Sequence, residues 1–416
     1  MAAVREDKGT WTIEYPVGKT LYSITRGYLS DPRLSPDGAF VAFFEHQQLG
    51  DDRGWVKIVD RGGNVRTLDG EFWGEEGTAW SRDSKTVYYS AAADGSQNYQ
   101  VRAVNVTGTP SPRRVIGAPN AMEVLDIHAT GQILAITDEM RAGVRARLAG
   151  EKDERDFPWL DFSINSHISA DGKHLAFTDL SASAGTDYAV AWRDTVGGPV
   201  VRLGPGLATG LSPDSQWVGM KKLSTMDGGF YPTGTGEPIK LAGFHMSGSN
   251  RSGPTFFADG THALVCGFAG ESKASRCYRT EVRAGAPLEP VTPEGVIGAL
   301  FAGSDRTLVV SKSDGSLWVM TIGSDTLVPA KGLSSERATM GRSAVPNSVF
   351  SAPLELPLKV YRVNVLTGDR TLVRTLTLPD ISGAVELGVS SWSDDGPYTY
   401  HFTRELSQLF VVSGVK

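Results

Sequence analysis

The chain has 416 residues, a formal net charge of −6 at pH 7, 40% hydrophobic residues and 21% charged residues. This is the composition of a mildly acidic globular protein with enough apolar residues for a large core. It excludes a nucleic-acid binder that works through a basic tract, because no run of five or more lysines and arginines occurs and a net negative chain repels phosphate. No apolar signal region and no membrane-spanning run of about 18 apolar residues is present, so we predict a cytoplasmic protein without a membrane partner.

Turn-forming residues dominate the composition, with 48 glycines and 22 prolines, and this favours an all-β fold with many short strands. The two cysteines, Cys266 and Cys277, follow and precede strand-like segments and could face each other across a hairpin. One pair does not make a disulfide framework, so we expect two reduced thiols.

The chain begins with an extension over residues 1–17 and a strand-like segment, GKTLYSI, from Gly18. A short phrase then recurs, in which an apolar strand leads through a Ser-Pro-Asp-Gly-like turn into a second strand rich in aromatic and β-branched residues. Proline presets the first turn dihedral, aspartate bonds its own backbone and glycine takes a positive φ. The turns begin at Ser35, Ser81, His128, Ser169, Ser212, Phe257, Ala302 and Ser393.

The first seven turns are spaced by 41 to 47 residues, and Ser393 lies 91 residues after Ala302, which is two periods. A ninth, degraded unit is therefore expected near residues 337–376. Each unit continues into a third and a fourth strand, and four strands in about 45 residues are typical of a propeller blade. We predict a single β-propeller domain over residues 1–416, with the ring itself over 18–416 and nine blades, or eight if the degraded unit is not a blade. Pairing of the segment from Gly18 with the last blade would close the ring and hide both edges.

These phrases resemble the repeats of TolB-type, WD-repeat-like propellers. The segments GYLSDPRLSPDGAFVAFFEH from Gly27, GDDRGWVKIVD from Gly50, EGTAWSRDSKTVYYSA from Glu76 and RELSQLFVVSGVK from Arg404 look more specifically like the propeller attached to bacterial serine/threonine kinases. The resemblance runs from about Gly18 to Lys416 and implies a sensor or docking module. The kinase motifs are missing, so the resemblance does not imply kinase activity.

Motifs for other chemistry are absent from the sequence. It has no Gly-x-Ser-x-Gly elbow, no His-Glu-x-x-His, no Cys-x-x-Cys and no Walker loop. We therefore expect no metal and no cofactor.

The strongest site candidates follow from where loops lie in a propeller, because the loops at the channel mouth usually carry the ligand. The first unit places Glu45, His46 and Asp51 there, and if the protein is an enzyme these three are its expected acid–base residues. The same charges could equally form a solvated loop with local ion pairs. The expected ligand-binding residues are Arg53, Trp73, Glu75, Glu76, Tyr99, His245, Arg251 and Arg404. Trp73 offers a stacking surface or ordinary packing, and Arg251 could hold a carboxylate or remain solvated.

Two functions are compatible with these features, and the sequence leaves open whether the protein is an enzyme. The first is a docking or sensor module that binds a protein, a peptide or a small molecule at the channel mouth, as a monomer. The alternative is a cofactor-free cyclase, isomerase or lyase with acid–base residues in the funnel.

Overall fold

The computed structural model describes residues 1–49, 51–93, 98–118, 121–157, 162–249, 251–333, 337–353, 356–394 and 396–414. These residues form antiparallel β-sheets, and the one helical segment among them is a 3-10 turn, η1 (Ala182–Ala184). No helix within these ranges is long and apolar enough to cross a membrane. The all-β prediction is confirmed. The chain divides into two compact units, residues 1–140 with 405–416 and residues 141–404.

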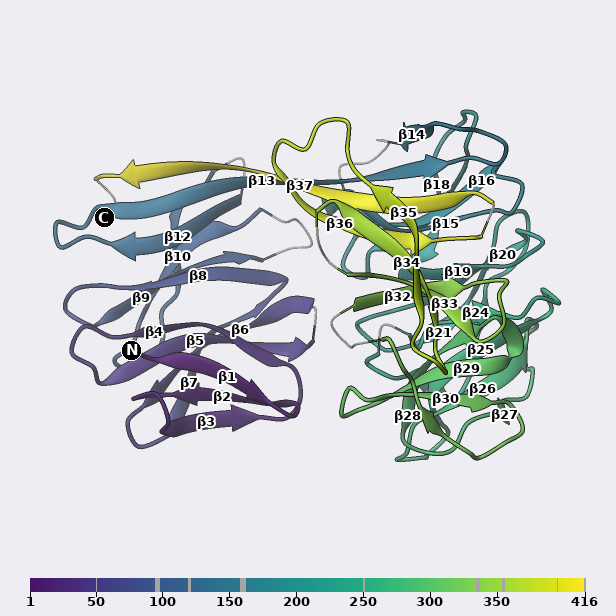
Figure 1. The fold of residues 1–416 in the computed structure, drawn as a ribbon. Helices are drawn as coiled ribbons and strands as arrows, with labels where there is room; N and C mark the ends of the chain where they lie inside the picture. Colours follow the sequence, from purple (N-terminus) through teal and green to yellow (C-terminus); the bar gives the residue numbers. More distant parts are fainter. Residues whose placement is uncertain are drawn as a thin grey trace. The chain divides into compact units, whose positions relative to one another are not determined.

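The first unit is built from three sheets of its own and part of a fourth (Figure 1). Its strands are β1 (Ala3–Asp7), β2 (Thr10–Glu14), β3 (Thr20–Ile24), β4 (Tyr28–Leu34), β5 (Phe40–Gln48), β6 (Asp51–Asp60), β7 (Val65–Phe72), β8 (Gly74–Trp80), β9 (Thr86–Ala92), β10 (Gln100–Asn105), β11 (Arg113–Ile116) and β12 (Ala121–Ile127). The sheet orders are β1-β2-β3, β4-β5-β6-β7 and β8-β9-β10-β11.

Two long strands, β13 (Ile133–Arg147) and β37 (Tyr398–Val412), pair with each other and contribute residues to both units. In the first unit, β13 also pairs with β12. In the second unit, it pairs with β14 (Glu154–Phe157), and β37 pairs with β36 (Ala384–Ser391).

The second unit contains five further sheets. Their strands are β15 (Ser163–Ile168), β16 (His174–Asp179), β17 (Ala189–Asp194), β18 (Val201–Pro205), β19 (Leu207–Leu211), β20 (Trp217–Lys221), β21 (Gly228–Pro232), β22 (Ile239–Lys240), β23 (Phe244–Met246), β24 (Thr255–Phe256), β25 (His262–Ala269), β26 (Arg276–Glu281), β27 (Glu289–Pro290), β28 (Val296–Ala302), β29 (Ser304–Lys312), β30 (Leu317–Thr321), β31 (Val328–Pro329), β32 (Arg337–Arg342), β33 (Ser348–Pro353), β34 (Leu358–Asn364) and β35 (Arg370–Leu376). Neighbouring sheets contact one another in chain order, through β15 and β19, β19 and β24, β25 and β28, β28 and β32, and β32 and β36. Because β36 also contacts β15, the six sheets form a closed ring.

The predicted turns connect the first two strands of each repeat. In the first copy, the Ser35 and Gly38 amides donate to the Phe40 and Ser35 carbonyls, and the Ser35 hydroxyl donates to Asp37. The same pattern of bonds recurs around Ser81, Ser169 and Ser212. The degraded unit expected over residues 337–376 forms the four-stranded sheet β32-β33-β34-β35.

The predicted ring closure is wrong, and a single closed ring of nine blades is not confirmed. The segment from Gly18 forms β3, which pairs with β2 and not with the last repeat, while β37 pairs with β13 and β36. The β2–β3 hairpin needs a loop of only a few residues, so it forms at a lower entropic cost than pairing across the length of the chain. The extension expected over residues 1–17 contains β1 and β2. The single domain over residues 1–416 stays a prediction.

The expectation of free thiols is also wrong. Cys266 and Cys277 lie directly opposite each other in the β25–β26 register, with their Cα atoms 3.9 Å apart, and they form a disulfide. Disulfides persist mainly in oxidising compartments. The pair therefore argues against the cytoplasmic location, which stays a prediction.

Candidate functional site

His46 lies in β5 and is almost completely buried. Its Nε2 is 2.9 Å from the Ser30 hydroxyl, its Nδ1 is 3.1 Å from the Asp52 carbonyl, and its ring stacks on Tyr28 at 4.0 Å between centroids. Burial lowers the pKa of His46 below its usual value. Both ring nitrogens are used and one ring face is covered, which is the environment of a structural histidine.

Glu45 and Asp51, the other two predicted acid–base residues, are each held by a cation. Glu45 accepts from the Tyr22 hydroxyl at 2.7 Å and lies 2.7 Å from the Lys57 ammonium. Asp51 accepts from Arg53 Nε at 2.9 Å, and the Arg53 guanidinium lies 5.0 Å from the centre of the Trp73 ring. Both carboxylates are therefore already engaged in ion pairs and hydrogen bonds within this cluster.

Glu75 in β8 differs from these paired carboxylates. Its side chain is buried, with 3% of the residue exposed, and neither carboxylate oxygen has a hydrogen-bond partner among the described residues. Burial first, and then the charges of Asp69, Asp31 and Asp52, raise the pKa of Glu75 well above its ordinary value. Glu75 therefore keeps its proton to a higher pH than an exposed glutamate does.

The next residue of β8 is Glu76. Its carboxylate lies near that of Glu123 in β12, because β8 bulges at Gly77. Gly77 has a φ of +65°, and a Cβ placed on it would lie 2.4 Å from the Val124 carbonyl and 2.6 Å from Glu123 Cγ. Only glycine permits this approach of β8 to β12.

Asp138 completes a group of three carboxylates. In the β12–β13 register, Glu123 is opposite Ile136, so Asp138 lies two residues further along β13, on the same face of the sheet. Carboxylate oxygens of Glu76, Glu123 and Asp138 lie within 4.8 Å of one another, and the Ser407 hydroxyl donates to Asp138. Such convergent oxygens could hold a hard divalent cation or a cationic organic group.

Burial and mutual repulsion keep part of this group protonated. Burial first, followed by the charge of Glu123, raises the pKa of Glu76 to about 8. Burial first, followed by the charge of Asp31, raises the pKa of Glu123 to about 7. A cation bound among these oxygens would relieve the repulsion and displace the protons.

A cavity of about 210 Å³ lies beside Glu123. Asp31, Arg33, Thr78 and Leu125 also line it. Arg33 Nε donates to the Thr78 carbonyl at 3.0 Å and Arg33 Nη2 donates to the Leu125 carbonyl at 2.7 Å, so its hydrogen bonds go to backbone. The carboxylate site, defined here as Asp31, Glu76, Glu123 and Asp138, therefore combines a small cavity with an excess of negative charge.

The remaining predicted residues do not join this site. The ring of Tyr99 packs over Gly74, where a Cβ would meet the phenol oxygen at 2.5 Å. His245, Arg251 and Arg404 belong to the second unit. His245 lies 3.9 Å from Asp227, Arg404 pairs with Asp380 at 3.2 Å, and burial lowers the pKa of Arg251.

Sequence reasoning missed Glu123 and did not group Asp138 with Glu76. The alternation in AMEVLDI could have placed Glu123 on one face of a strand. Its meeting with Glu76 depends on the positive φ of Gly77, which no turn motif marks.

Comparisons with known proteins identify no family for this chain. No family model matches it, and no curated protein matches its sequence. Similar solved structures include TolB from Acinetobacter baumannii, with 19% identity, a TM-score of 0.26 and coverage of 57% of this chain and 64% of that one. They also include a TolB from Agrobacterium tumefaciens, with 15% identity, a TM-score of 0.30 and coverage of 82% and 94%.

A structure from a study of two prolyl endopeptidases is also similar, with 11% identity, a TM-score of 0.35 and coverage of 87% of this chain. The present chain spans 51% of the length of that endopeptidase chain.

Proposed function

We propose that this protein is a binding module that takes a positively charged group of a partner protein or peptide at the carboxylate site of its first unit. The observation that carries the proposal is the convergence of Glu76, Glu123 and Asp138 within 4.8 Å. With Asp31 on the cavity wall, the site has four carboxylates, and its one lining cation, Arg33, donates to backbone carbonyls. A lysine or arginine side chain would offset part of their negative charge.

This proposal keeps the docking role expected from the sequence and makes it more specific. The acid–base alternative is less well supported because Glu45, His46 and Asp51 are engaged in ion pairs, hydrogen bonds and stacking. A sensor role, a monomeric state and the absence of nucleic-acid or membrane partners stay predictions.

The proposal is tested with a fluorescently labelled tetralysine peptide, titrated with the full chain and followed by anisotropy. Since cation binding needs ionised carboxylates, the affinity is expected to rise between pH 6 and pH 8.5, through the pKa values of about 7 for Glu123 and about 8 for Glu76. The double variant E123Q/D138N is expected to bind about tenfold more weakly or worse at pH 8.5.

The matched control is E6Q, which removes one carboxylate from β1, away from the site in sequence. E6Q should bind the peptide as the wild type does. Equal weakening by E6Q and by E123Q/D138N, or an affinity that does not change with pH, would mean that general acidity and not this site attracts the peptide.

A further inference from the structure

A second cavity lies wholly within the second unit, between the β15-β16-β17-β18 and β19-β20-β21-β22 sheets. It has a volume of about 470 Å³, which is enough for an amino-acid side chain with its flanking backbone. Its lining residues come from the two Ser-x-Asp turns and the strands beside them. They are Ala170, Asp171, His174, Trp192, Pro213, Asp214, Ser215, Gln216, Thr233 and Gly234.

Two carboxylates stand on opposite walls of this cleft, each held by its own turn. Asp171 accepts from the Ser169 hydroxyl at 2.6 Å and from the Lys173 amide at 3.0 Å. Asp214 accepts from the Ser212 hydroxyl at 2.6 Å and from the Gln216 amide at 3.1 Å. Asp171 also lies 3.7 Å from the exposed Lys173 ammonium. Because an ionised carboxylate has about four acceptor positions, both carboxylates keep capacity for a further donor.

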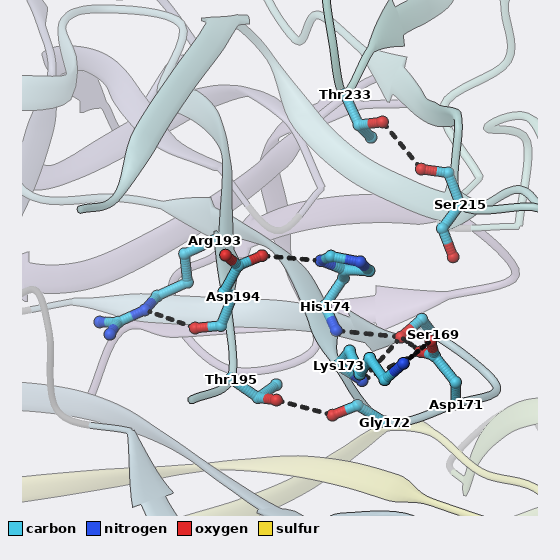
Figure 2. A network of polar contacts seen from close by, with 10 residues as sticks. All are labelled: Ser169, Asp171, Gly172, Lys173, His174, Arg193, Asp194, Thr195, Ser215 and Thr233. Carbon is cyan, nitrogen blue, oxygen red and sulfur yellow. Dashed lines mark hydrogen bonds and ion pairs between the residues drawn. The ribbon is translucent and has the colours of Figure 1, made fainter. Parts of the chain in front are cut away.

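An aromatic pair forms another part of the wall. The rings of His174 and Trp192 stack at 5.0 Å between centroids, and His174 Nδ1 lies 2.9 Å from Asp194. On the facing sheet, the Thr233 hydroxyl donates to the Ser215 carbonyl at 2.8 Å. Figure 2 shows the His174–Asp194 and Thr233–Ser215 contacts, which fix these side chains beside the cleft. The lining residues include no lysine or arginine.

The strand register shows what occupies the equivalent position in other sheets. The Ser169, Phe257 and Ser343 turns are each closed by an amide that donates to the carbonyl five residues later, at His174, His262 and Ser348. Two residues after each of these carbonyls, at Ala176, Leu264 and Phe350, the second strand of the sheet pairs with a residue of the third strand. The third-strand partners are Trp192, Arg279 and Arg362 respectively.

The two arginines at this position each bind an aromatic ring and a turn carboxylate. The Arg279 guanidinium lies 5.3 Å from the Phe257 ring centre and 3.8 Å from Asp259. Asp259 occupies the same place in its turn as Asp171. Arg362 lies 6.0 Å from the Phe350 ring centre and donates to Asp394, in the turn of the following sheet. In the Ser212 turn of the cleft, Pro213 stands at the position of Asp394, and the carboxylate of this turn, Asp214, is one residue further along.

The cleft therefore has a carboxylate in each of its two turns and an aromatic surface, and a tryptophan stands where two other sheets of the second unit have an arginine. The sheets with the Ser35, Ser81 and Ser212 turns have Ile58, Ala103 and Phe230 at this position. We propose that the cleft binds the guanidinium group of an arginine supplied by a partner peptide or protein. The planar guanidinium stacks on the aromatic wall and donates to Asp171 and Asp214, as Arg279 and Arg362 do inside the molecule. This site is separate from the carboxylate site and does not depend on the function proposed for it.

The test is calorimetric titration of the full chain with acetyl-Gly-Arg-Gly-amide and with the peptides in which lysine or citrulline replaces arginine. The arginine peptide is expected to bind saturably. Lysine should bind about tenfold more weakly, because it cannot donate in a planar fork, and citrulline should not bind measurably, because it has no charge. The variant D171N/D214N is expected to lose about tenfold or more in affinity.

Two further variants make the outcome decisive. D83N changes the same kind of turn in the first unit, where Ser81 bonds Asp83 at 2.7 Å, and it should bind as the wild type does. W192R should place an internal guanidinium in the cleft and abolish binding of the arginine peptide. The proposal is overturned if the arginine peptide gives no saturable heat, if citrulline binds as well as arginine, or if D171N/D214N and W192R bind like the wild type.

Discussion

At the scale of single residues, Glu75 has the least favourable environment among the predicted site residues. Its pKa in the folded state is well above the ordinary 4.5. At any pH between 4.5 and the pKa of folded Glu75, the folded state binds more protons than the unfolded state. The stabilising effect of the neutral acid is therefore complete below about pH 4.5 and is lost as the pH rises toward the folded pKa.

We predict that E75Q melts at a higher temperature than the wild type at pH 8 and at a similar temperature near pH 4.5. Glutamine keeps the shape and cannot ionise, and each pH unit over which the wild type resists ionisation costs about 1.4 kcal/mol. Thermal unfolding followed by circular dichroism across this range measures the difference. A gain that is equal at both pH values would mean that ionisation of Glu75 is not its cause. The pH dependence remaining in E75Q comes from the other groups with shifted pKa values, which include Glu76, Glu123, His167 and His401.

Residue-scale prediction from the sequence worked where an interaction is local. Asp51 and Arg53 are two residues apart, and their ion pair follows from one short loop. The Glu76–Glu123 approach joins segments 47 positions apart in sequence and depends on the bulge at Gly77. Composition and periodicity do not specify which face a strand presents after such a bulge.

At the scale of elements, the turn phrase was the strongest predictor. Serine and aspartate make the same hydrogen bonds in repeated turns, so each phrase marks a hairpin by local chemistry alone. Strand length was not specified in this way. β13 and β37 each run for 15 residues, and their mutual pairing replaced the expected closure by β3. No local motif distinguishes one long strand from two short ones in neighbouring blades.

In the second unit, the late strand β37 pairs with the early strand β13, and β13 pairs with β14, in which Glu154 bonds two tyrosines of β37. The Tyr398 and Tyr400 hydroxyls each donate to one Glu154 oxygen at 2.6 Å, and Arg145 lies 3.5 Å from the same carboxylate. E154A would leave two phenols without an acceptor, at about 1–3 kcal/mol each. We predict a lower melting temperature for E154A, by about 2–4 °C per kcal/mol lost.

The control for E154A is E151A. Glu151 precedes β14 and pairs with Arg155, a partly exposed residue, so its loss should shift the melting temperature by a degree or less. Circular dichroism melts of both variants at pH 7 make the comparison. If E154A has the same melting temperature as E151A and the wild type, the contacts of Tyr398 and Tyr400 with Glu154 do not stabilise the pairing of these strands.

At the scale of the whole molecule, the question is whether the two compact units unfold together. The first unit has its own buried clusters, such as the one around Phe44, Val56 and Tyr89. The second has others, such as the one around Phe350, Leu387 and Tyr400. Separate cores favour separate unfolding transitions. The long strands β13 and β37 contribute to both units and favour coupling.

We predict two calorimetric transitions, because most of the strands and clusters belong to one unit each. E75Q, in the first unit, should shift one transition at pH 8, and E154A, in the second, should shift the other. Variants in one cooperative domain would instead move a single transition, upward for E75Q and downward for E154A. That result would support the single domain expected from the sequence, since one transition responding to both variants requires that the loss of either core unfolds the whole chain.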